Sequence, residues 1–254
     1  MQEGGAFLWD VIADDLAERL AFVTRQFERA LVIGPIAAHR GLILGSRDAT
    51  ITVAALAGSE RNSEDDVIVE EDRLPFEPAS FDLVISAGTL DSVNDLPGAL
   101  IQIRRCLKPD GLFLGHMFGV GTLGTLKSMM LAAEGDAASP HVHPQIDLRS
   151  AADLLSRAGF ALPVADQDVM PVRYGTWRSL VTDVRHGGLG NALSGPRRYL
   201  GKDLLARLDG LWVASAEERF AHLYLTGWAP APDQPKPARR GSGTTSLADV
   251  LKPK

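Results

Sequence analysis

Two histidines and an aspartate come nearest to a metal site among the side chains of this sequence. His141 and His143 lie one residue apart in the segment SPHVHPQ, and Asp147 follows four residues later. Imidazole and carboxylate groups are common ligands of transition metals, but protein zinc sites use at least three protein ligands. Two histidines with no third ligand beside them are a weak metal signal. We therefore expect no metal, and these three residues would be the first to test if one were bound.

Glycines offer a second kind of chemistry, because a backbone without side chains can approach a ligand closely. Gly34 ends the apolar run 30–33, which is where a buried strand would deliver a ligand-binding turn. Gly119, Gly121 and Gly124 spell a GxGxxG-like pattern, but they follow a much later strand. A lone match at that place is weak evidence for a dinucleotide site, so we expect these glycines to form a loop over a pocket.

Strands and helices alternate along the chain and must position these residues. Apolar runs predict strands at 30–33, 51–53, 67–69, 81–86, 111–117, 164–174 and 220–226. Helical spacing and capping residues predict helices at 7–27, 42–44, 95–107 and 150–158, with two more in 176–212 hinged at 187–195. Lys-Pro-Asp-Gly at 108–111 predicts a turn between helix and strand. Such alternation implies a mostly parallel sheet with helices on both faces.

Composition indicates one globular domain at 1–230 and a tail at 231–254. The tail is rich in Pro, Gly, Ser, Thr and Lys and is expected to be disordered. No apolar run is long enough to span a membrane, and the acidic N-terminal segment does not resemble a secretory signal. The single cysteine, Cys106, excludes an internal disulfide and is expected to be structural. We expect a cytoplasmic protein.

Charge is divided unevenly between the two parts. The net charge is −6 overall, while the tail carries five Lys/Arg and two acids and is therefore +3, which leaves −9 for the domain. Nucleic-acid binding needs clustered cations, so we expect no nucleic-acid partner.

Beyond these patterns, the chain from residue 70 onward resembles a known family. The segment VNDLPGALIQIRRCLKPDGLFL, followed by AADLLSRAGFALPVAD, PVRYGTW, NAL, YLTGWAP and GSGTTSLADVL, is similar to class I methyltransferase-like proteins. The closest resemblance is to the family of a mitochondrial complex I assembly factor that acts as an arginine hydroxylase, and its bacterial homologues. Malonyl-acyl-carrier-protein O-methyltransferase is a more distant relative. The resemblance implies an α/β, Rossmann-like three-layer sandwich that usually binds S-adenosylmethionine. Its mostly parallel seven-stranded sheet would have an antiparallel last strand and a helical insertion at about 175–212.

The resemblance also implies positions for the binding residues. A retained cofactor site would use the first glycine of the loop, the acids before LPF and the loop after the fourth strand, namely Gly34, Glu70, Glu71, Ala87, Gly88 and Thr89. The substrate or partner side would use residues of the insertion and its approach, namely Arg173, Tyr174, Trp177, Arg185 and Asn191.

Several positions depart from the family pattern. Pro35, Ile36 and Ala38 stand in the loop where close-approach glycines are expected. The acid that would accept the ribose hydroxyls is replaced by Ala54 or Ala55. Asp91 and Ser92 replace a His-Trp pair that relatives carry near the substrate. Each loss of a polar contact costs roughly 1–3 kcal/mol, so several together would weaken a micromolar site beyond millimolar.

These departures favour a methyltransferase-family protein with an eroded S-adenosylmethionine site that acts by binding a protein partner, as an assembly factor or pseudoenzyme. In this interpretation the cofactor binds weakly or not at all. The alternative is an active methyltransferase or arginine hydroxylase-like enzyme acting on a protein or small acid. A third hypothesis is a subunit that assembles with an active paralogue or with further copies of itself.

Overall fold

A single seven-stranded sheet forms the centre of the molecule. The computed structural model describes residues 6–57, 63–135, 140–193, 200–213, 216–232 and 234. The strands, which cross the sheet in the order β3-β2-β1-β4-β5-β7-β6, are β1 (Arg29–Ile33), β2 (Thr50–Leu56), β3 (Val67–Val69), β4 (Phe81–Ala87), β5 (Leu107–Phe118), β6 (Ala161–Tyr174) and β7 (Ala216–Trp228). The first five are parallel, while β7 pairs antiparallel with β5 and β6 antiparallel with β7. This confirms the predicted mixed sheet.

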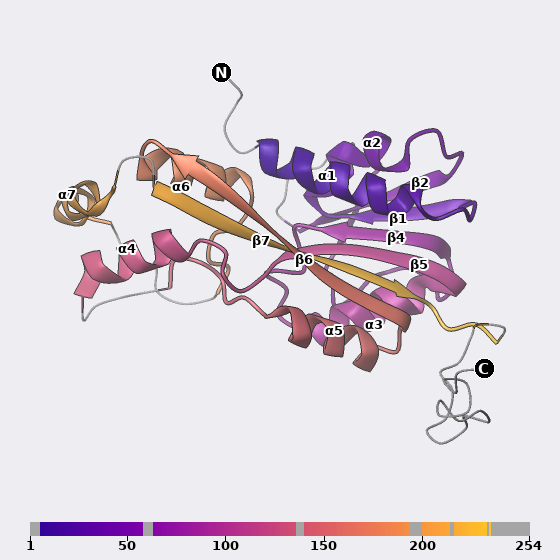
Figure 1. Cartoon of the computed structure of the whole chain (residues 1–254). Coiled ribbons are helices and arrows are strands. Elements are labelled where there is room, and N and C mark those ends of the chain that lie inside the picture. Colours follow the sequence, from indigo (N-terminus) through magenta and orange to yellow (C-terminus); the bar gives the residue numbers. More distant parts are fainter. Residues whose placement is uncertain are drawn as a thin grey trace, which may run out of the picture.

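One face of the sheet is covered by α1 (Ala6–Ala21), the 3-10 helix η1 (Pro35–His39), α2 (Arg40–Leu44) and α6 (Trp177–His186) (Figure 1). The apolar residues Leu8, Ile12, Leu16 and Leu20 recur at helical spacing in α1 and are fully buried against the sheet. Helix α1 ends at Ala21 and not at Phe27 as the periodicity predicted. The guanidinium of Arg47 donates to the carbonyl oxygens of Leu20 and Val23, which satisfies the end of the helix.

The other face is covered by α3 (Leu96–Cys106) and α5 (Leu148–Arg157) (Figure 1). Asp95 caps α3 by accepting a hydrogen bond from the backbone N–H of Gly98 at 2.9 Å, as the sequence predicted. Cys106, the last residue of α3, is free and buried.

The 108–111 segment is part of a strand and not a separate turn. Strand β5 already begins at Leu107, and the register between β4 and β5 shifts from Phe81↔Leu107 to Leu83↔Leu112. Asp110 has a positive φ of 60°, and its backbone N–H donates to the carbonyl oxygen of Ala229 on the neighbouring chain segment. The residues that would make a turn therefore form a bulge, because Ala229, the residue after β7, exchanges backbone hydrogen bonds with Asp110 and Gly111.

Strands β6 and β7 extend beyond the rest of the sheet and carry α4 (Gly124–Glu134), α6 and α7 (Lys202–Leu211) around their far ends (Figure 1). The insertion thus contains the two helices expected between 176 and 212. Helix α4 was not predicted. Its first turn is held by Glu218, a buried carboxylate on β7 that accepts from the backbone N–H groups of Thr125 and Leu126. A partner almost a hundred residues away leaves no local sequence signal.

Among the described residues, no helix combines the length and apolar character that a membrane crossing requires. Apart from Ala231, Pro232 and Gln234, the expected tail lies outside the described residues.

Candidate functional site

The carboxyl ends of β1 and β4 lie side by side, which is where ligands bind in open α/β sheets. Gly34 follows β1 with a positive φ of 90°. A Cβ at this residue would lie 2.8 Å from the carbonyl oxygen of Ala87 and would overlap the methyl group of Thr89. Glycine is therefore required here, but protein atoms fill the space that its missing side chain leaves.

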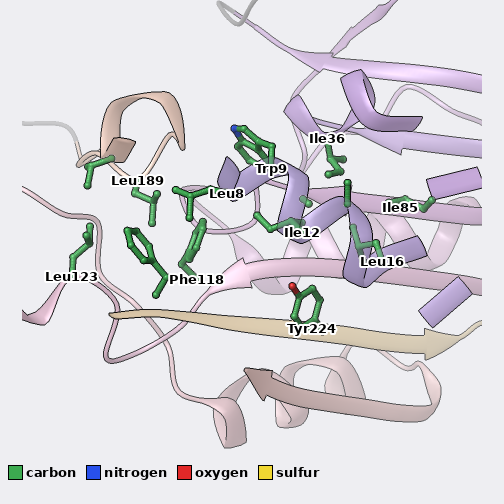
Figure 2. Close-up of a cluster of buried hydrophobic side chains, with 14 of the residues drawn as sticks. Leu8, Trp9, Ile12, Leu16, Ile36, Ile85, Phe118, Leu123, Leu189 and Tyr224 are labelled. Atoms are coloured by element: carbon green, nitrogen blue, oxygen red, sulfur yellow. The ribbon is translucent and has the colours of Figure 1, made fainter. Parts of the chain in front are cut away.

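Trp9 of α1 covers the same edge of the sheet. An added Cβ at Gly88 would lie 3.0 Å from the Cζ3 atom of Trp9 and 3.2 Å from the Cδ atom of Pro35. The indole N–H donates to the carbonyl oxygen of His186 at 3.2 Å, which ties α1 to the end of α6. In Figure 2, Trp9 lies on α1 beside Ile36, in the buried cluster that also contains Phe118 and Leu189. This role of Trp9 could not be predicted from the sequence, because an aromatic residue on an amphipathic helix is usually part of the core.

The acids expected near the adenine group lie on the same edge. Glu70 is exposed, whereas Glu71 is half-buried, and its side chain makes a hydrogen bond with Thr89. Burial raises the pKa of Glu71 above its ordinary value. Ala54 and Ala55 are buried in β2 and bring no polar side chain to this edge. The structure therefore brings together Gly34, Ala87, Gly88, Thr89 and Glu71, but without the ribose acceptor.

A small cavity lies next to this edge, on the side of the insertion. The loop after β4 contributes Gly88, Asp91 and Ser92, while His143 and the loop 187–190 contribute the opposite wall. Its volume is about 20 Å³, which is close to the space of one water molecule. The loop Gly-Gly-Leu-Gly at 187–190 was predicted as a hinge between helices, and it lies here because α6 ends against α1.

Asp91 is the acidic side chain among the residues of this cavity. Its carboxylate accepts a hydrogen bond from the backbone N–H of Phe118 at the end of β5. Burial raises the pKa of Asp91 from 3.8 to about 7, and the hydrogen bond from Phe118 only partly offsets this. A carboxyl group with a pKa near neutrality can accept or release a proton under ordinary conditions.

The five residues expected on the substrate or partner side do not line this cavity. Arg173 and Arg185 are exposed, and Tyr174 is buried. Trp177 is also buried and donates its indole N–H to Asp209 of α7 at 2.8 Å. Asn191 donates to the carbonyl oxygen of Pro140 at 2.9 Å. None of these five residues lines the cavity. Their role in binding a substrate or partner therefore stays a prediction.

The three residues considered for a metal serve separate purposes. His141 forms an ion pair with buried Glu134, with 2.9 Å between Nε2 and Oε1, and His143 lines the cavity. Asp147 caps α5 through the backbone N–H of Ser150 at 2.8 Å. Within the described parts of the chain, no three His, Cys, Asp or Glu side chains are grouped closely enough to hold a metal ion.

A second polar group, not foreseen from the sequence as a pair, lies beneath α1. His116 on β5 and His222 on β7 are buried, with 3.0 Å between Nε2 of His116 and Nδ1 of His222. Burial lowers the pKa of both, that of His222 to about 4. Both imidazoles are therefore neutral at pH 7, and they are part of the core and not of the cavity.

Comparison with known proteins supports the fold described above. A family model described as a methyltransferase domain matches residues 47–115. The YcgJ protein of Bacillus subtilis has a similar structure, with a TM-score of 0.54 and 14% sequence identity over 85% of this chain and 98% of that one. Together with the strand order, these matches define the fold as that of the class I methyltransferases.

Sequence relatives define the family more narrowly. The mitochondrial arginine-hydroxylase NDUFAF5 of Danio rerio is 31% identical over 97% of this chain and 82% of its own length. The malonyl-[acyl-carrier protein] O-methyltransferase of Gallionella capsiferriformans is 32% identical over 65% of this chain and 58% of its own length. The chain therefore belongs to the family of the arginine-hydroxylase NDUFAF5, which confirms the resemblance found in the sequence.

S-adenosylmethionine is the cofactor that this fold implies, and the residues at the expected site do not fit it. At the carboxyl ends of β1 and β4, Thr89 lies close to Gly34 and the indole of Trp9 lies close to Gly88. Ala54 and Ala55 offer no oxygen to a ribose. The adjoining cavity has room for about one water molecule, far less than the 300 Å³ or more of a typical small-molecule site.

Proposed function

We propose that this chain has lost S-adenosylmethionine binding and acts by binding a protein partner, as an assembly factor or pseudoenzyme of its family. The observation that carries the proposal is the close approach of Thr89 to Gly34 and of Trp9 to Gly88, which leaves little free space beside either glycine. The missing ribose acceptor at Ala54 and Ala55 supports it independently, because it removes an interaction that packing alone would not affect. The relative from Danio rerio is an arginine-hydroxylase, and the proposal takes only its family from it.

Calorimetric titration of the purified protein with S-adenosylmethionine and S-adenosylhomocysteine tests the first half of this proposal. We expect no heat of binding at millimolar ligand. Micromolar binding would contradict it. Regained affinity in a variant with Pro35→Gly, Ile36→Gly and Ala38→Gly, combined with Ala54→Asp or Ala55→Asp, would show that the loop and the missing acceptor, and not the packing of Thr89 and Trp9, exclude the ligand. The glycine triple variant alone is the matched control, since it relaxes the loop without restoring the acceptor.

Partner binding is tested by affinity capture with the full chain. The exposed guanidinium of Arg185 on α6 lies on the insertion, beside the loop that lines the cavity. We expect Arg185→Glu to reduce capture of the partner, whereas Arg149→Glu on α5, an equal change of charge on the opposite face, should not. Equal capture by both variants would show that the insertion is not the binding surface. Copurification with an active paralogue would identify that paralogue as the partner.

A second candidate function rests on Asp91. A carboxyl group with a pKa of about 7 in a cavity is a typical general base, so an enzyme acting on a protein or a small acid is the alternative. Under this alternative, any activity should rise with pH through about 7 and disappear in Asp91→Asn. Under the preferred proposal, Asp91→Asn leaves partner capture unchanged.

A further inference from the structure

The outer strand of the sheet and the end of α1 form a groove that nothing in the described chain covers. We call it the α1–β6 groove. One wall is the hollow formed by Asp15, Glu18, Arg19 and Phe22. As the other wall we take Asp166, which pairs with Arg19, and the β6 residues that alternate with it, namely Leu162, Val164 and Asp168. Arg19 and Asp166 join the two walls through a bidentate ion pair of 2.7 and 2.5 Å.

The groove is both apolar and acidic. Phe22 is 79% exposed, Leu162 51% and Val164 53%, so each offers apolar surface to an occupant. Its charged members are four carboxylates and one guanidinium, so it carries a net charge of −3. A matching occupant must therefore be cationic and must carry a few apolar side chains.

The described chain ends at this groove. Gln234 lies in a hollow of about 440 Å³ together with Leu162, Trp228 and Arg25. Its side-chain amide donates to Oδ1 of Asp110 at 2.8 Å and to the carbonyl oxygen of Ala229 at 3.0 Å, which fixes the point where the remaining chain begins. A second hollow of about 260 Å³, lined by Asp15, Glu18, Arg19 and Phe22, continues along α1.

The segment that follows Gln234 has the required chemistry. Residues 235–254 carry one acid and five cations, namely Lys236, Arg239, Arg240, Lys252 and Lys254. Leu247, Val250 and Leu251 have the i, i+3, i+4 spacing that places side chains on one side of a helical turn. Twenty residues can extend over about 66 Å, whereas the β6 wall from Leu162 to Asp168 measures about 20 Å, so the segment can reach every part of the groove.

We propose that residues 235–254 of this chain dock in the α1–β6 groove of the same molecule, with their cations against its carboxylates and Leu247, Val250 and Leu251 on its apolar residues. The docked segment would cover the side of β6 that α1 leaves open. A tethered segment needs little intrinsic affinity, because the effective concentration created by the short connection is millimolar.

Crosslinking in the full chain tests this docking. Ala21 is exposed at the rim of the groove, and Ala248 lies within the apolar stretch of the segment, so the pair Ala21→Cys and Ala248→Cys should join within one chain through a short bis-maleimide. The control pair replaces Ala21→Cys by Ser156→Cys on α5, on the opposite face of the sheet. Native Cys106 is buried and does not compete.

We expect the groove pair to react at least about fivefold faster than the control pair, since an undocked tether presents similar concentrations to both faces. The ratio of the two crosslinking rates should decrease in 1 M salt, where charges interact over only about 3 Å. Equal rates for the two pairs would overturn the proposal. Crosslinks found only between two chains would also overturn it, because they would make a second copy the occupant.

Hydrogen exchange provides a test that needs no cysteine. Reversing three cations of the segment, with Lys236→Glu, Arg239→Glu and Arg240→Glu, should speed exchange of the amides of 162–168 and 15–22. The matched control reverses Arg149, Arg157 and Lys202, which are exposed and lie outside the groove. Unchanged exchange in the first variant would contradict the docking.

Discussion

The guanidinium carbon of Arg19 lies 4.2 Å from the ring centroid of Tyr224. Because Arg19 also pairs with Asp166, its side chain spans from α1 across β7 to β6. Beneath this layer lie His116 and His222, neutral and out of contact with solvent. Burial is the main reason that the pKa of each histidine is lowered; Arg19 adds to this effect for His116, whereas Asp15 and Asp168 oppose it for His222.

Acid should destabilise the protein through this histidine pair. The pKa of both histidines is lowered in the folded state, so the unfolded chain binds their protons first as the pH falls below 6.5. The stabilisation is complete above pH 6.5 and is lost as the pH falls towards 4, on the order of 2 kcal/mol for His222 alone. Urea unfolding, measured between pH 7.5 and pH 4, gives the free energy of unfolding as a function of pH. This free energy should fall less steeply towards low pH in the double variant His116→Gln, His222→Asn than in the wild type. An unchanged slope would mean that other groups govern acid unfolding.

Asp91 should give the free energy of unfolding the opposite pH dependence, because its stabilising effect is lost as the pH rises. Its pKa is about 7 in the folded state and 3.8 in its ordinary state, so its contribution to stability is complete below pH 3.8 and is lost as the pH rises through 7. Asp91→Asn keeps an oxygen for the N–H of Phe118 but carries no charge. The variant should exceed the wild type in free energy of unfolding by on the order of 2–4 kcal/mol at pH 8, and the gap should narrow towards pH 4. A gap independent of pH would refute this assignment.

Glu218 should control the attachment of α4. Its carboxylate accepts from the backbone N–H groups of Thr125 at 3.2 Å, Leu126 at 2.8 Å and Arg219 at 3.0 Å. Glu218→Ala removes the acceptor of all three N–H groups, of which that of Leu126 is buried, and this should lower the free energy of unfolding by about 1–3 kcal/mol and speed hydrogen exchange in α4 first. Glu217→Ala, a more exposed neighbour on the same strand, serves as the comparison. Equal losses in the two variants would rule out the capping role.

Trp9 should be as important for stability as any core residue, although it lies at the edge of the sheet where the cofactor of this fold would bind. Trp9→Ala removes a side chain that is 9% exposed and should cost about 3–5 kcal/mol in free energy of unfolding, measured in urea. Trp9→Phe keeps most of the contact with Gly88 but loses the hydrogen bond to His186, so a smaller loss is expected. A cost below about 1 kcal/mol for Trp9→Ala would mean that the indole is a mobile cover and not part of the core.

The sheet and its helices could be predicted from the sequence because their signals are local. Apolar runs such as Phe81–Ala87 and caps such as Asp95 act within a few residues of themselves. The features that were predicted wrongly or not at all depend on contacts with residues far away in the sequence. Helix α1 ends where Arg47 reaches it, the bulge at Asp110 depends on β7, and α4 begins at Glu218.

The candidate site shows the same division. The loops at Gly34 and at Ala87–Thr89 could be placed because strand ends mark them. The approach of Trp9 to Gly88 could not be predicted, because Trp9 comes from a distant part of the chain. The position of residues 187–190 in the cavity wall also depends on a distant contact, that of α6 with α1.

The outermost position of β6 has a consequence for how the chain avoids aggregation. A 14-residue edge strand would offer a long row of free backbone groups to another strand during and after folding. Pro163 and Pro171 interrupt that row because proline has no N–H to donate, and Asp166 and Asp168 place charges on it. A variant with both prolines replaced would therefore be prone to form fibres through strand-to-strand addition, even if every contact within the folded molecule were kept.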